Sequence, residues 1–186
     1  MSVKQTHTSE HSTYFCTFTC HQWMPLFEIT NSYDIVYNWF EILQQRSVDV
    51  IGYVIMPNHL HCILHFNNEK FSVNKTIGNG KRFMAYEIIN RLEKDNHAHL
   101  LAVLSNACTT RDKNKGQLHK VFKQSFDAKA IFSDKFMAQK LNYMHVNPVT
   151  GKWRLVDDFT TFEHSSASFY ELGIVKHFTP RHFRSL

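Results

Sequence analysis

The sequence reads VDVIGYVIMPNHLHCILHF from Val48 to Phe66, and this stretch decides the fold. Residues 48–56 are β-branched and apolar enough for a central strand. Residues 59–66 alternate between apolar and polar side chains, as a second strand does. Pro57 and Asn58 interrupt the pattern between the two runs, and both residue types are common in turns. We therefore predict two antiparallel strands joined as a hairpin.

Other elements are predicted on both sides of this hairpin from apolar spacing and capping residues. They are strands over residues 14–20 and 118–125 and helices over residues 32–46, 72–94 and 134–146, with residues 97–108 either a short helix or irregular. The resulting order is β-α-β-β-α-β-α. It predicts an α+β ferredoxin-like sandwich, with an antiparallel sheet and helices on one face.

One of these helical patterns contains an interruption. Gly78-Asn79-Gly80 lies near the start of the pattern over residues 72–94. The interruption has two interpretations: a helix break where backbone approaches phosphate, or a loop between two short helices.

The composition indicates a globular protein, because 43% of the 186 residues are hydrophobic and 14% are aromatic. No run approaches the roughly 18–20 apolar residues that a membrane span needs, and residues 1–11 lack the apolar region of a secretory signal. We expect a single domain over residues 1–186, with a disordered-like N-terminus over residues 1–12 and a C-terminal tail over residues 171–186. The end of that tail, from Arg181, is basic and expected to be exposed.

Positive charge is concentrated in one part of the chain. The formal net charge is +5, yet residues 111–154 alone contain ten Lys or Arg residues and three Asp. Aromatic residues are interspersed among these charges. A basic segment with aromatic residues suits a polyanion such as nucleic acid, although many surface lysines only solvate a protein.

The four cysteines favour a reduced, cytoplasmic protein. Cys16 and Cys20 are four residues apart with His21 beside them, which suggests a zinc site. The alternative is that both cysteines belong to a strand. The second interpretation is favoured because no further pair follows at the spacing of a zinc finger.

His59 and His61 are candidate metal ligands. In a strand, residues i and i+2 point to the same face, so both imidazoles project together while Leu60 turns to the other side. Two imidazoles on one face can hold a divalent metal ion. The alternative is two ordinary histidines on a half-exposed strand. His65 lies on the same face and either joins the pair or is merely exposed.

Tyr143 and Asn147, in the run LNYMHVNP, are candidates for the chemistry. They are four residues apart and hence neighbours on one face of a helix. Lys140 and Phe136 extend this stripe, whereas the apolar stripe suited to packing is a different one. A tyrosine hydroxyl can attack phosphorus and remain attached to it, although a packing tyrosine would have the same spacing.

Taken together, these runs resemble one family. YVIMPNHLHCIL, then GNGKRF and then KLNYMHVNPV resemble the single-tyrosine HUH transposases, and most closely the REP-associated tyrosine transposases and their relatives in small insertion sequences. YFCTFTCHQWMPLFE and EHSSASFY extend the resemblance from about Tyr14 to Tyr170. The chain departs from the pattern at His21-Gln22-Trp23, where members often carry an Arg that contacts phosphate.

The resemblance implies a ferredoxin-like fold, usually dimeric, with His59 and His61 as metal ligands and Tyr143 as the nucleophile. It also suggests Asn147 as a third ligand through its amide oxygen. The expected ion is Mg²⁺ or Mn²⁺, and the expected products are a 5′-phosphotyrosine link and a free 3′-hydroxyl. Lys140 is one turn before Tyr143. It either places phosphate or eases loss of the tyrosine proton, or it is only a solvated lysine.

The expected substrate is single-stranded DNA next to a hairpin, and the expected location is the nucleoid of a bacterial cytoplasm. Four basic residues are candidates for contacts with phosphate: Lys81, Arg82, Lys120 and Lys123. Three alternatives remain open. They are a hairpin-binding regulator that does not cut, a hydrolase in which water attacks the phosphate, and a protein that holds structural zinc on its cysteines.

Overall fold

In the computed structural model, residues 12–67, 72–151 and 153–186 are described. The expectation of a disordered N-terminus concerns residues 1–11 almost entirely, and these lie outside the described residues. The strands are β1 (Thr13–Thr19), β2 (Val48–Met56), β3 (His59–Phe66) and β4 (Asp127–Ala130). The helices are α1 (Leu26–Ile29), α2 (Tyr33–Gln45), α3 (Val73–Lys94), α4 (Ala98–Asn106), α5 (Thr110–Lys113), α6 (Asp134–His145) and α7 (Ala167–Leu172). The 3₁₀ turns are η1 (His21–Trp23), η2 (Asn147–Val149), η3 (Phe159–Thr161) and η4 (Phe183–Ser185).

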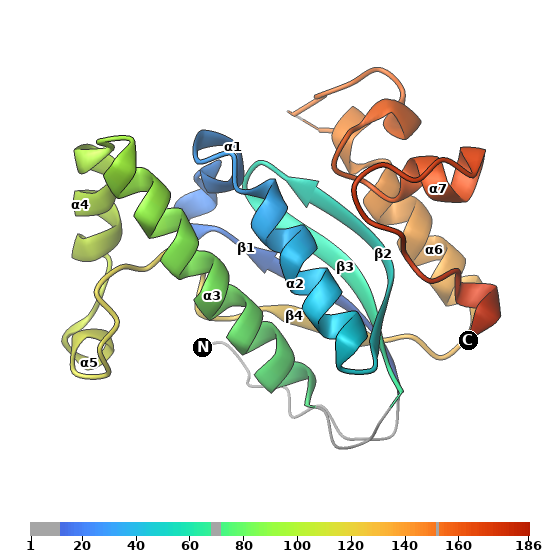
Figure 1. Cartoon of the computed structure of the whole chain (residues 1–186), viewed down its shortest axis with the longest axis horizontal. Coiled ribbons are helices and arrows are strands. Elements are labelled where there is room, and N and C mark those ends of the chain that lie inside the picture. The colour runs from blue at the N-terminus through green and yellow to red at the C-terminus, as the bar shows by residue number, and fades with distance from the viewer. Residues whose placement is uncertain (1–11, 68–71, 152) are drawn as a thin grey trace.

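The four strands form one antiparallel sheet in the order β2-β3-β1-β4. The prediction that residues 48–56 form a central strand is wrong, because β2 lies at an edge of the sheet and is buried by the helices that cover its two faces. The predicted hairpin is confirmed, because Met56 pairs with His59 across the two-residue turn. A helical segment connects β1 to β2, and a second one connects β3 to β4 (Figure 1). The α+β class and the ferredoxin-like order of elements are therefore confirmed.

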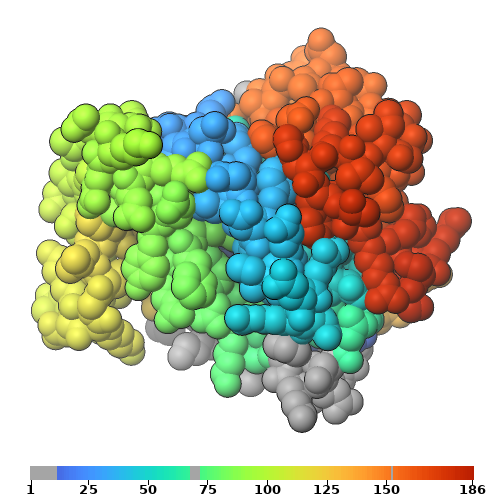
Figure 2. Space-filling view, in the orientation of Figure 1, coloured from blue at the N-terminus to red at the C-terminus, as the bar shows by residue number. Residues whose placement is uncertain are grey.

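Helices α2 and α3 cover one face of the sheet (Figure 1). On this face the alternate residues Tyr14, Cys16 and Phe18 of β1 and Leu60 and Cys62 of β3 are buried in the larger hydrophobic core. Figure 2 shows α3, α2 and the C-terminal residues side by side across this side of the molecule. Burial of this face accounts for the apolar half of the strand alternation.

Helix α6 packs against the opposite face, so the expectation that helices lie on one face only is wrong. The second core joins Met137, Leu141 and Met144 of α6 to Ile51 and Val54 of β2 and to further strand residues of the same face. This burial follows from a second apolar stripe, because β2 is apolar on both of its sides. Both faces of a sheet built from such strands need a covering layer.

A β-bulge and a glycine allow α6 to lie close to β2. The pairing of β2 with β3 shifts register between Val50 and Gly52. A Cβ atom on Gly52 would lie 2.4 Å from the Met144 side chain and 2.7 Å from the Leu141 side chain. A side chain at this position would therefore require the ends of these two α6 side chains to move.

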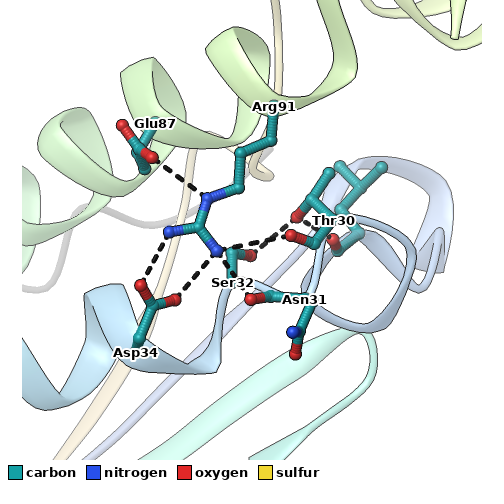
Figure 3. Close-up of polar contacts among 7 residues, drawn as sticks. Thr30, Asn31, Ser32, Asp34, Glu87 and Arg91 are labelled. Carbon is teal, nitrogen blue, oxygen red and sulfur yellow. Dashed lines mark hydrogen bonds and ion pairs between the residues drawn. The ribbon is translucent and has the colours of Figure 1, made fainter. Parts of the chain in front are cut away.

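Arg91 fixes α3 against the start of α2 (Figure 3). Its guanidinium donates to both carboxylate oxygens of Asp34, at 2.9 and 2.7 Å, and to Glu87 at 3.0 Å. It also donates to the carbonyl of Asn31 at 2.6 Å. Such two-pronged contact is the strong form of an arginine–carboxylate pair, and it positions the loop that follows α1.

Two predicted elements differ from the structure. The strand predicted over residues 118–125 is wrong: this segment is irregular apart from one bridge between Phe122 and Cys20, and the strand that pairs with β1 is β4. The interruption predicted at Gly78-Asn79-Gly80 is also wrong, because α3 runs through it without a break. Gly80 is buried there, and an added Cβ would lie 2.6 Å from the ring of Trp39. The glycine therefore serves helix packing.

The C-terminal segment packs against the sheet and α2 through Arg181 and Phe178, so the tail expected to be exposed from Arg181 is exposed only in part: residues 181–183 are partly buried and residues 184–186 are exposed. The backbone N–H of Arg181 donates to the carbonyl of Val50 at 2.9 Å, and its guanidinium pairs with Asp49 at 2.6 Å. Phe178 is buried against the rings of Phe40 and Tyr53. Within the described ranges, no helix is long and apolar enough to cross a membrane.

Candidate active site

His59 and His61 lie on the face of the sheet that α6 covers, as their spacing in a strand predicts. Their ring centroids are 4.8 Å apart and their planes are nearly perpendicular. The ring of Phe15, in the neighbouring strand β1, stacks on the His61 ring with 5.3 Å between the ring centroids. His65 does not join the pair, because its Nδ1 bonds the Thr13 hydroxyl at 2.8 Å at the other end of β3.

Two polar side chains orient these imidazoles. Asn58 is fully buried in the turn before β3, where its amide nitrogen donates to the carbonyl of Trp23 at 3.1 Å. That bond fixes which end of the amide is oxygen, so the oxygen accepts from Nδ1 of His59 at 2.6 Å. Nδ1 of His61 bonds the Thr17 hydroxyl at 2.7 Å. Nδ1 of His59 thus carries its proton, which leaves a lone pair on Nε2.

Burial keeps both imidazoles neutral. It lowers the pKa of His59 from 6.5 to about 4. It also lowers the pKa of His61 to about 3, with smaller contributions from His59 and from the Lys140 ammonium. An imidazole must be neutral to bind a metal ion, so the pair has the protonation state that a ligand needs at pH 7.

Tyr143 lies beside the histidines and is half exposed, at 50%. Its ring packs edge to face against the rings of His61 and Phe15, with distances of 5.5 and 6.0 Å between ring centroids. The Lys140 ammonium lies 5.4 Å from the centre of the Tyr143 ring and 5.0 Å from that of Phe15. Burial, with a smaller contribution from Lys129, lowers the pKa of Lys140. The structure thus brings together the tyrosine, the lysine and the histidine pair.

Ser133 positions this helix. It is the N-cap of α6, and its hydroxyl accepts from the backbone N–H of Phe136 at 3.2 Å. Asn147 begins η2, directly after α6, and its amide nitrogen donates to the carbonyl of Tyr143 at 3.3 Å. This bond leaves the amide oxygen as the free end of the side chain. Asn147 is thereby tied to the helix that carries Tyr143 and not to either histidine.

The side chains at this site fit a divalent ion that has an incomplete set of protein ligands. No group of three or more His, Cys, Asp or Glu that could hold a metal is found in the parts of the chain that the structure describes. An ion here would therefore depend on the two imidazoles and on water or substrate oxygen for its other ligands. Open positions of this kind are typical of catalytic sites rather than structural ones.

The same result bears on the zinc alternative. Cys16 and Cys20 are both buried, the first in β1 and the second at its bridge to Phe122. His21 follows in η1, and its Nε2 is buried without a hydrogen-bond partner in the described chain. These three side chains do not form a metal-binding group in that part of the structure, so the favoured interpretation as strand cysteines fits better.

The four basic candidates lie in different settings. Lys81 of α3 donates to the backbone carbonyls of Lys123, Gln124 and Ser125, at 2.6, 3.1 and 3.4 Å. Burial lowers its pKa to about 8. Lys123 projects its ammonium 4.3 Å from the centre of the Trp23 ring. Lys81 thus holds the segment that carries Lys123.

The other two candidates differ in exposure. Arg82 is exposed on α3, and its guanidinium lies 5.1 Å from the centre of the Phe83 ring. Lys120 is partly buried, and its backbone N–H donates to the carbonyl of Leu104. Its charge adds to the effect of burial in lowering the pKa of His21.

Sequence reasoning missed four residues at this site. They are Phe15, Thr17, Trp23 and Asn58. Trp23 is half exposed, and its ring meets His59 edge to face at 5.8 Å. The pairing of β1 with β3 would have placed Thr17 opposite His61, but that register is not visible in a single sequence.

Comparison with known proteins gives the fold. No family model matches the sequence, and no curated protein matches it. The chain is similar to the solved structure of a REP-associated tyrosine transposase bound to a REP hairpin, with a TM-score of 0.58, 17% identity and coverage of 97% of this chain and 92% of that one. A candidate transposase from Deinococcus radiodurans R1 has a TM-score of 0.44 and 12% identity, with coverage of 77% and 95%. The chain therefore has the fold of a REP-associated tyrosine transposase over nearly its whole length.

Proposed function

We propose that the protein is a tyrosine transposase that cuts and rejoins single-stranded DNA next to a hairpin. The observation that carries this proposal is the half-exposed Tyr143, whose ring contacts His61 of a pair of neutral, buried histidines. The fold of a transposase whose solved structure holds a REP hairpin supports the substrate class. The proposed partners are hairpin-bearing DNA and a second copy of the chain.

The cutting step uses the Tyr143 hydroxyl as nucleophile. Its oxygen attacks the phosphorus, the bond from phosphorus to the 3′-oxygen breaks, and the tyrosine proton is balanced by protonation of the leaving oxygen. The products are a 5′-phosphotyrosine and a free 3′-hydroxyl. Attack by another 3′-hydroxyl reverses the step and rejoins DNA without an external energy source.

The surrounding residues prepare this attack. Lys140 places a positive charge beside the Tyr143 ring, where it favours the anionic phosphate and the loss of the tyrosine proton. Thr17 and Asn58 hold the two imidazoles in fixed orientation. His59 and His61, with the amide oxygen of Asn147, would hold Mg²⁺ or Mn²⁺. When bound, the ion would stabilise the negative charge that builds on the phosphate oxygens.

Arg82, Lys120 and Lys123 are the proposed contacts with the DNA backbone. Such contacts position a strand without reading its sequence. Lys81 was predicted as a fourth contact, but its ammonium donates to three carbonyl oxygens. We assign it to holding the loop that presents Lys123.

A gel assay for covalent adducts tests the proposal. Hairpin-bearing single-stranded DNA from the flank of the gene is labelled at its 3′ or 5′ end, incubated with protein and Mg²⁺ or Mn²⁺, and denatured. The 3′ label is expected at protein mass. The 5′ label is expected in a shorter free strand that a polymerase can extend. Both signals should disappear with EDTA and in Tyr143→Phe, but not in Tyr86→Phe, which changes another exposed tyrosine, on α3.

Two results would overturn the proposal. Hairpin binding by folded protein without an adduct would indicate a regulator that does not cut. Cutting that continues in Tyr143→Phe would indicate that water is the nucleophile.

A further inference from the structure

A row of rings and ammonium groups extends past the candidate active site in both directions. On one side, the Lys140 ammonium lies 5.2 Å from the centre of the Phe136 ring, and Phe136 stacks with Phe132 at 5.3 Å and 21°. On the other side, the ring of Trp23 contacts His59, and the Lys123 ammonium covers a face of this indole. The row therefore has an aromatic ring at each end and the nucleophile between them.

The two end rings are exposed although both are large and apolar. Trp23 is 51% exposed and Phe132 is 74% exposed, the highest value among the large hydrophobic side chains described. Exposed aromatic side chains next to a catalytic site indicate a binding surface rather than packing.

The backbone at Trp23 is held in an unfavourable conformation. Gln22 and Trp23 have φ angles of 51° and 59°, the left-handed region that residues other than glycine rarely adopt. The turn persists because the N–H of Trp23 donates to the carbonyl of Cys20 at 3.2 Å, and its own carbonyl accepts from the buried amide of Asn58. Strain of this kind is typical of functional sites, and here it holds the indole beside His59.

We propose that an unpaired DNA strand lies along this row, with one base stacked on Trp23 and another on Phe132. This inference rests on the proposed function, and it names the residues that hold the substrate on either side of Tyr143. Bases stack on aromatic rings whatever their sequence, and the alternating ammonium groups suit the phosphates between them. The paired bases of a duplex expose no such faces, so the row selects unpaired DNA.

Charge favours a nucleic acid over a protein as the occupant. Lys123 and Lys140 contribute their ammonium groups within the row itself. Residues 111–154, which include most of the row, contain ten basic residues against three acidic ones. A polyanion with flat rings matches both features at once.

Binding of a labelled unpaired oligonucleotide tests the proposal. Measurements use Tyr143→Phe as the parent, with EDTA present, so that neither cutting nor metal binding affects the result. Trp23→Ala and Phe132→Ala should each weaken binding roughly 5- to 150-fold, the range found for loss of one base–ring stack. Affinity for a blunt duplex should stay within about twofold. Tyr86→Ala, which removes an exposed ring from α3, should change neither.

Fluorescence gives a readout that a merely structural role would not affect. Stacking of a base should quench the Trp23 emission. The quenching should therefore be lost in Trp23→Phe, while binding by this variant stays closer to that of the parent than to Trp23→Ala. The other two tryptophans, Trp39 and Trp153, are present in both proteins and cancel in the comparison.

Three outcomes would overturn the inference. The first is unchanged affinity in folded Trp23→Ala and Phe132→Ala, and the second is an equal loss for duplex DNA. The third is a parent dimer that these variants dissociate without loss of DNA affinity, since the row would then be a contact between copies. Failure of the proposed function is separate: the covalent adduct would be absent although unpaired DNA still bound through the two rings.

Discussion

Replacing Asn58 tests whether a buried amide keeps the histidine pair ready to bind metal. The side chain is fully buried and has two contacts, the carbonyl of Trp23 at 3.1 Å and Nδ1 of His59 at 2.6 Å. Asn58→Ala removes both. Asn58→Asp has the same shape, keeps an acceptor for His59 and loses the donor to Trp23. The pair of variants therefore separates the two contacts.

The size of the effect follows from what each variant leaves without a partner. A buried polar group that loses its partner costs about 1–3 kcal/mol. Asn58→Ala leaves two such groups, but water can reach the half-exposed Trp23, so we expect a loss of about 2–4 kcal/mol in the free energy of unfolding. Loss of a partner that orients a histidine ligand typically weakens metal binding about 10- to 100-fold. Asn58→Asp should keep Mn²⁺ affinity within about threefold, since a carboxylate is a common partner of a ligating histidine.

The assay is a Mn²⁺ titration followed by the electron paramagnetic resonance signal of the free ion, beside urea unfolding of the same samples. Asn67→Ala is the matched control, because Asn67 follows the other end of β3 and its amide bonds Asp49 at the surface. Folded Asn58→Ala that binds Mn²⁺ as tightly as the parent would refute the reasoning. An equal loss of affinity in Asn58→Asp would show that the contact with Trp23, and not the one with His59, is the important one.

Other predictions concern packing, charge and pH. Gly78→Ala should stabilise the protein by about 0.5–1 kcal/mol, because an added Cβ there has no atom within 4 Å. Gly80→Ala should destabilise it by about 1–2 kcal/mol, because the added Cβ would overpack against Trp39. Urea unfolding measures both changes. Lys123→Gln should reduce the slope of log binding constant against log salt concentration by about one unit. Lys81→Gln should weaken DNA binding and leave this slope unchanged, because Lys81 holds the loop. A reduced slope in Lys81→Gln would contradict that role. Burial lowers the pKa of His164 from 6.5 to about 4. Between these pH values the unfolded chain binds a proton at this imidazole and the folded protein does not, so the free energy of unfolding should fall as pH drops from about 6.5 to 4. The slope of the free energy of unfolding against pH over that range should be smaller in His164→Gln. An unchanged slope would show that His164 does not contribute to it.

The hairpin and the main helices could be predicted because their signals are local. Residues 48–56 and 59–66 have the bounds that the structure gives to β2 and β3. The strand β4, at the edge opposite β2, could not be predicted in this way. β4 reads DAKA, which is only four residues long with alanine as its sole apolar residue type, and it is a strand because β1 offers it a free edge. The segment over residues 118–125 has the better pattern, but Phe122 is buried among Phe18 and Phe27 in the core.

The residues of the candidate site also divide into those with a local signal in the sequence and those without one. The two histidines share a face because of a two-residue spacing, and Tyr143 follows from its position on a helix, so both were visible in the sequence. Their partners Thr17 and Asn58 were not. Thr17 is 44 residues from His61 and meets it only through strand pairing. Asn58 was assigned to a turn, and nothing local indicates that its amide bonds two groups at once.

Charge counting has a related limit, which Lys81 illustrates. In the sequence it is one more positive charge beside an Arg, in a run that suggests phosphate binding. In the structure its ammonium is bonded to three carbonyl oxygens, and burial lowers its pKa. An ammonium group that is desolvated and already donates to three carbonyl oxygens has no free donor for a phosphate. The positive field that a bound DNA strand would meet is therefore set by lysines that remain over exposed rings, such as Lys123 beside Trp23, and Lys81 would contribute by holding one of them in place.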